Sequence, residues 1–169
     1  MNWVWCLILF TIVGFNIIDL IRPFPIGWDD LGVYMNFPRQ IAMKGALLKG
    51  YTGQAYMLIT SLGYLVANSA TWAMFLAWWG GILGLWAMYL LGKKFVSSEA
   101  GIVMAAIMYG LPMIMHQSFA DMKLDPPLFF FVVIGFYPVF RALQLHGDEK
   151  RSVPSLGLSG IFCRVALAV

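Results

Sequence analysis

The run "AMFLAWWGGILGLWAMYLLG", residues 73–92, contains no charged residue. A helix needs about 20 predominantly apolar residues to cross the hydrocarbon core of a bilayer, so this run predicts a membrane-spanning helix. Gly80, Gly81 and Gly84 lack side-chain bulk, and the Gly-x-x-x-Gly spacing from Gly80 to Gly84 allows close contact with another helix. We therefore expect a fold that is built from packed membrane helices.

The rest of the chain is also strongly apolar. Hydrophobic residues make up 61% of it and charged residues 11%, whereas about a quarter of the residues in a soluble domain are charged. We expect an all-α, polytopic transmembrane protein that forms a single membrane domain over residues 1–169. Because the last apolar run stops at Val169, we expect the amino-terminal part of a longer protein. The other predicted membrane helices cover residues 2–21, 100–119, 127–143 and 154–169.

The segment 54–70 decides the topology, because it has nearly the length of a span but contains several polar residues. Polar side chains are costly in hydrocarbon, and tyrosines such as Tyr56 and Tyr64 favour the headgroup level, so we expect a helix that lies in the interface. Residues 22–72 then form an outer loop with interfacial helices, and the amino terminus is cytoplasmic. If the segment spans instead, the two acidic clusters of the chain fall on opposite faces of the membrane.

Motifs of the common soluble enzyme classes are absent from the sequence, including phosphate-binding loops, dinucleotide-binding glycine patterns and Gly-x-Ser-x-Gly turns. The net charge of +3 is small and scattered, so we expect no nucleic-acid partner, and the bilayer is the first partner.

Two acidic clusters remain as candidates for chemistry: Asp29 with Asp30, and Asp121 with Asp125. A carboxylate at a membrane surface can act as a general base or hold a divalent cation. Asp30 and Asp125 can also have purely structural roles. Asp30 can cap the helix that follows it, and Asp125 before Pro126 is a good helix start.

Several motifs together resemble the start of the glycosyltransferase-C superfamily, in particular its protein O-mannosyltransferase-like and lipid A aminoarabinose transferase-like members. Asp30 four residues before Tyr34, and Asp125 before a Pro-Pro-Leu-Phe-Phe helix start, match the acidic residues of the first two outer loops in that superfamily. The first pair is Asp-Asp here rather than the commoner Asp-Glu. The motifs are "GWDDLGVY" (27–34), "YLLGKKF" (89–95), "LPMIMHQSFADMKLDPPLFFF" (111–131) and "LGLSGIF" (156–162).

The resemblance implies a transferase that moves a sugar, with inversion, from a polyprenyl-phosphate donor to a lipid, glycan or protein acceptor. It implies an extracytoplasmic active face on a bacterial or archaeal plasma membrane. Asp30 is the preferred general base and Asp29 the second candidate. A divalent cation, if the reaction uses one, would be held by Asp30 and Asp125, and no other cofactor is expected. The candidates for substrate or donor-phosphate binding are Asp121, Asp125, Arg39, Lys44, Lys123 and His116.

The alternative function is a transporter or flippase fragment in which the acidic residues lie on an ion path. A third class is a non-catalytic membrane scaffold. A transporter should bury carboxylates in the middle of its helices, whereas the acidic clusters here lie at predicted helix ends. In a scaffold, the same acidic residues should be freely replaceable.

Overall fold

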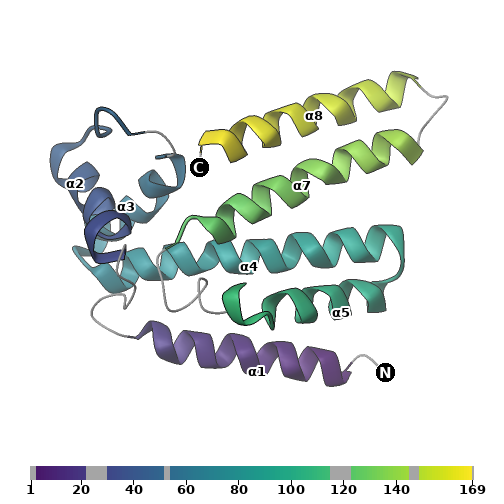
Figure 1. Cartoon of the computed structure of the whole chain (residues 1–169), viewed down its shortest axis with the longest axis horizontal. Helices are drawn as coiled ribbons and strands as arrows, with labels where there is room; N and C mark the ends of the chain where they lie inside the picture. The colour runs from purple at the N-terminus through teal and green to yellow at the C-terminus, as the bar shows by residue number, and fades with distance from the viewer. Residues whose placement is uncertain (1–2, 22–29, 52–53, 115–122, 145–148, 169) are drawn as a thin grey trace.

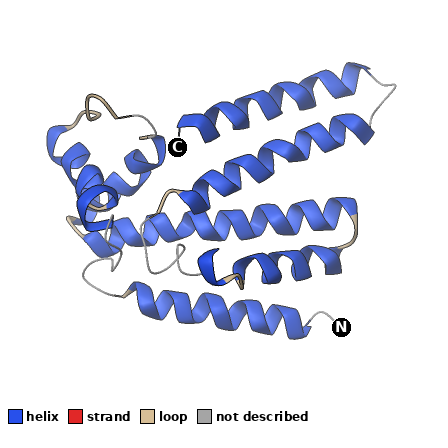
Figure 2. Cartoon of the chain, in the orientation of Figure 1, coloured by secondary structure: helices blue, strands red, loops and turns tan. Residues whose placement is uncertain are grey.

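The computed structural model describes residues 3–21, 30–51, 54–114, 123–144 and 149–168. Every regular element in these ranges is a helix (Figure 1, Figure 2). The predicted all-α class is therefore confirmed for the described part of the chain.

Helix α4 (Ala70–Phe95) contains the run 73–92 and lies at the centre of the fold, where it packs against α1, α3, α5 and α7 (Figure 1). At 1.5 Å per residue its 26 residues extend about 39 Å, which exceeds the ~30 Å hydrocarbon core. Within the described residues, two helices are long and apolar enough to cross a membrane: Ala70–Phe95 and Asp125–Leu143.

Helix α7 (Asp125–Gln144) begins where the Asp125–Pro126 pair predicts a helix start. Proline is favoured in the first turn because its missing N–H has no partner within the helix there. The bounds also agree with the predicted helix over 127–143. Helix α1 (Trp3–Leu20) likewise agrees with the prediction over 2–21.

Two predicted helices differ in their bounds. Helix α5 (Ser98–Tyr109) has only 12 residues, about 18 Å, and ends ten positions before the predicted end at residue 119. Pro112 accounts for this end, because a proline disfavours the helical conformation of the residue before it. Helix α8 (Glu149–Ala168) begins five residues before Pro154, since the Glu, Lys and Arg residues that precede the apolar run are good helix formers.

Two short helices lie at one end of the bundle (Figure 1). Helix α2 (Asn36–Lys44) ends at Gly45, whose φ of 63° places it in the left-handed region that glycine adopts without strain. Helix α3 (Ala55–Ala67) ends at Asn68, with a φ of 47°, and the chain then turns into α4.

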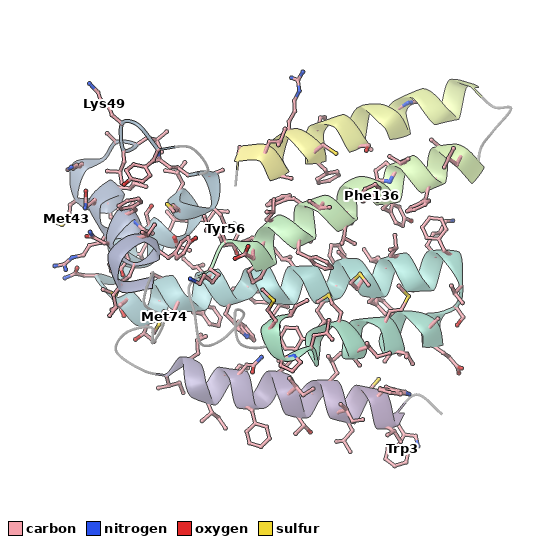
Figure 3. The ribbon with its side chains drawn as sticks, viewed as in Figure 1. Trp3, Met43, Lys49, Tyr56, Met74 and Phe136 are labelled. Carbon is pink, nitrogen blue, oxygen red and sulfur yellow. The ribbon has the colours of Figure 1, made fainter. Side chains whose placement is uncertain are left out.

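Helix α3 folds back along the start of α4. Gly63 lies so close to Ala73 that a Cβ atom at Gly63 would meet the Ala73 backbone. The Tyr56 hydroxyl points toward α4 and donates a hydrogen bond to the Leu76 carbonyl at 2.8 Å, whereas Met43 and Lys49 point outward (Figure 3). The 13 residues of α3 extend about 20 Å, too short for the hydrocarbon core, which agrees with the predicted non-spanning helix.

Candidate functional site

The candidate site lies at the end of the bundle where α2 and α3 pack. A short π-helical segment, η1 (Asp30–Tyr34), begins at Asp30, the second residue of the first acidic pair. Its last residues join a hydrophobic cluster that also includes Leu124, the residue before α7. Apolar burial therefore holds the two chain segments that carry the acidic clusters against the same pair of helices. The buried members are Phe37, Ile41 and Met57, with Val33, Tyr34, Leu48 and Leu124 packed against them.

A charged contact joins the same two segments. The Lys123 ammonium lies 5.1 Å from the centre of the Tyr34 ring. A cation over an aromatic face is attracted by the ring quadrupole. Asp30 is the first residue of η1, and Asp125 follows Lys123 by two positions. Both segments therefore meet at one end of the molecule.

The described part of the chain does not include every predicted site residue. Asp29, Asp121 and His116 lie outside the described residues, and for Asp30 only the backbone is described. The backbone tests the alternative that Asp30 caps the helix after it. The residue directly before α2 is Met35, not Asp30. Asp30 is therefore not the N-cap of that helix.

Asp125 is exposed at the first position of α7. The amino-terminal end of a helix carries partial positive charge, which favours an ionised carboxylate. Within the described residues, no hydrogen bond or ion pair involves this side chain. Pro127, in the first turn of α7, packs closely on Gly80 of α4, so the backbone that carries Asp125 is held against the bundle.

The predicted cations differ in their surroundings. Arg39 is exposed on α2. Burial raises the pKa of the Tyr64 hydroxyl, and the Arg39 charge lowers it by less. Lys123 is half-buried beside Tyr34, and Lys44 is exposed in the last turn of α2. Of these cations, Lys123 thus has a direct contact with an aromatic ring of the candidate site.

Two polar atoms at this end were not identified from the sequence. The Tyr64 hydroxyl and the Trp78 indole N–H are buried, and neither has a hydrogen-bond partner in the part of the chain that the structure describes. Both residues belong to the cluster that packs α3 and α4 against α1. Their spacing resembles that of ordinary packing residues, so no sequence signal could distinguish them.

The structure offers limited ligands for a metal ion. Among the described residues, no group of three or more His, Cys, Asp or Glu side chains could hold one. Cation binding by Asp30 and Asp125 stays a prediction, because the Asp30 side chain lies outside this part of the chain.

Comparison of the chain with models of known protein families, with curated proteins and with solved structures gives no match.

Proposed function

We propose that this chain is part of an integral, multi-pass membrane glycosyltransferase that transfers a sugar from a polyprenyl-phosphate donor to an acceptor at the extracytoplasmic face. The proposal rests on the motif resemblance described above and on the polarity of the bundle end that carries Asp30 and Asp125. In this arrangement the amino terminus is cytoplasmic and the loops that contain η1 and Lys123 face outward.

The observation that carries the proposal is the contact between Lys123 and Tyr34 at 5.1 Å. Sugar transfer from a lipid phosphate needs a carboxylate and a cation on one side of the membrane, close enough to serve one substrate. The contact supports this requirement, because it joins the segment that begins with Asp30 to the segment that leads into Asp125. A transporter would need carboxylates within the helices, and Asp19, the second-last residue of α1, is the acidic residue that favours that alternative. The acidic residues of the candidate site, Asp30 and Asp125, lie instead at the first positions of η1 and α7.

The proposed chemistry is a single displacement. The Asp30 carboxylate takes the proton from the acceptor hydroxyl or amine as that atom forms its bond to the anomeric carbon. The bond between the anomeric carbon and the phosphate oxygen breaks on the opposite side, which inverts the configuration. Lys123 and Arg39 balance the negative charge that develops on the departing polyprenyl phosphate.

The test is Asp30→Asn in membranes that contain the full-length protein. An amide cannot accept the proton, so transfer of radiolabelled sugar from a polyprenyl-phosphate donor should fall by about 10²-fold or more. Gel filtration of the detergent-extracted variant should give the wild-type profile. Turnover at the wild-type rate would contradict the general-base role.

Glu99→Gln provides a matched control. Glu99 lies in the first turn of α5, next to the α4–α5 turn and at the opposite end of α4 from η1. Like Asp30→Asn, this substitution replaces one carboxylate by an amide of the same size. Because Glu99 lies far from η1, the transfer rate of the variant should stay close to that of the wild type. An equal loss in both variants would indicate a general effect on the protein rather than a reaction at Asp30.

A further inference from the structure

A cavity of about 200 Å³ lies between α4, α5 and α7 beside Asp125. Gly84 of α4 lines one side, Phe129 of α7 another, and Met108 and Met113 close it from α5 and the residues after it. Carbon and sulfur atoms form most of this lining. Among the described residues that line it, Asp125 supplies the ionisable side chain.

The space depends on a glycine. A Cβ atom at Gly84 would lie 3.3 Å from Phe129 Cδ1 and 4.0 Å from Met108 Cε, so larger side chains at this position would extend into the cavity. Methionine is unbranched and flexible, and it adapts its shape to what it contacts. A glycine opposite a phenylalanine, with two methionines around them, suits a small apolar group of variable shape.

The size of the cavity limits its occupant. An apolar protein cavity of about 150 Å³ is large enough to hold benzene. The present cavity can therefore hold one ring, or a branched chain of similar volume, with a short substituent. A long lipid chain would not fit within it.

Asp125 determines the charge of that substituent. In the described part of the chain its carboxylate forms no ion pair, and this exposed side chain borders the apolar lining of the cavity. A cationic group attached to the apolar occupant would pair with this carboxylate, and an anionic group would be repelled.

We propose that this cavity binds a small amphipathic amine, with its apolar group between α4 and α7 and its ammonium group on the Asp125 carboxylate. This inference concerns binding alone and does not depend on the proposed sugar transfer. The binding assay needs no turnover, so loss of transfer activity in other variants would leave it unaffected.

The test uses 4-fluorobenzylammonium as the probe, and its binding to the detergent-solubilised full-length protein is followed by fluorine NMR line broadening. The neutral 4-fluorobenzyl alcohol and the anionic 4-fluorobenzoate are measured in the same micelles. We expect the amine to bind about tenfold more tightly than the alcohol, as for one charge-assisted hydrogen bond, and the benzoate most weakly. Asp125→Asn should bring the affinities of amine and alcohol close together.

Gly84→Leu should fill the cavity and weaken binding of all three probes by tenfold or more. Gly160→Leu is the matched control, since a Cβ atom at Gly160 meets no atom within 4 Å, and its affinities should equal those of the wild type. If Gly84→Leu fails to give a monodisperse protein, Gly84→Ala decides the test, because its added methyl lies 3.3 Å from Phe129 Cδ1 and narrows the cavity.

Two results would overturn the proposal. Equal affinities for amine and alcohol in the wild type, or a preference that survives Asp125→Asn, would contradict the role of the carboxylate. Unchanged affinity in Gly84→Leu, or in Gly84→Ala where the leucine variant is not monodisperse, would show that the probe binds elsewhere.

Discussion

Asn16 and Tyr109 form a hydrogen bond between α1 and α5, in which the Asn16 side-chain amide donates to the Tyr109 hydroxyl at 2.7 Å. Asn16 is 1% exposed and Tyr109 is 0% exposed. A buried amide without a partner costs more free energy than the hydrogen bond itself contributes, because the group has lost its contact with water. This pair therefore favours the one arrangement of α1 against α5 in which both polar groups are satisfied.

At the residue scale we predict that Tyr109→Phe lowers the free energy of unfolding by about 1–3 kcal/mol, since it removes the acceptor of the Asn16 amide and leaves the ring packing intact. The measurement is thermal or chemical unfolding of the detergent-solubilised protein. Tyr51→Phe removes a hydroxyl from a residue that is 55% exposed and should change stability little. Similar effects of both substitutions would contradict the prediction.

Glycines allow close approach in the α4–α7 and α4–α5 helix pairs. The predicted close contact at Gly80 and Gly84 is confirmed, because α7 packs on this face of α4. At the α4–α5 pair, a Cβ atom at Gly92 would lie 2.6 Å from the Gly101 Cα. Such contacts let helix backbones approach closely, which increases dispersion attraction along both helices.

At the element scale we predict opposite effects for two Gly→Ala substitutions. The added methyl of Gly80→Ala would lie 2.6 Å from Pro127 Cδ, and proline cannot rotate away, so α7 must move and stability should fall by about 1–3 kcal/mol. Gly14→Ala on α1 meets no atom within 4 Å. It should be neutral or stabilising by up to ~1 kcal/mol, because alanine favours the helix.

Unfolding midpoints of the two variants, measured side by side in the same detergent, test this contrast. A stability loss in Gly14→Ala as large as that in Gly80→Ala would show that the position of the glycine relative to α7 does not matter.

The two ends of the helix bundle carry different elements. One end carries η1, α2, α3 and the start of α7, and the other carries the α4–α5 turn with Lys93 and Lys94 (Figure 1). Helix α4 runs from one end to the other and is long enough to cross a bilayer. Residues near η1 and Asp125 should then lie on one side of the membrane, and residues near the α4–α5 turn on the other.

At this scale we predict the labelling pattern of single cysteines. The two free cysteines, Cys6 and Cys163, are first replaced by alanine. A membrane-impermeant maleimide added to intact cells should then label Leu31→Cys and Asp125→Cys. It should label Val96→Cys, at the α4–α5 turn, only after the cells are opened. Labelling of positions 31 and 125 from opposite sides would contradict the single-site arrangement and, with it, the basis of the proposed function.

Much of the helical content could be predicted from the sequence, because it follows from local properties. The length of an apolar run and the Asp125–Pro126 pair are sufficient to predict α1, α4 and α7. The error in α5 has a local cause as well, since Gly110, Leu111 and Pro112 interrupt a run whose mean hydropathy stays high. Hydropathy indicates where a helix is apolar but not where its backbone hydrogen bonds stop.

The candidate site could be predicted only in part. The residue types, carboxylates with nearby cations, could be read from the sequence. The contact between Lys123 and Tyr34 could not, because the two residues are far apart along the chain. Nor could the buried Tyr64 hydroxyl, which has no hydrogen-bond partner among the described residues and whose burial depends on how α3 folds back on α4.

The sequence by itself determined that the described chain forms apolar helices and where most of them begin and end, because helix propensity and hydropathy depend on neighbouring residues. Only the tertiary structure decided that the segment beginning with Asp30 meets the segment before Asp125, and that a cavity opens beside Asp125. Both features depend on contacts between residues that are far apart along the chain. Close packing permits only a few arrangements of such contacts, and no local sequence pattern specifies which one forms.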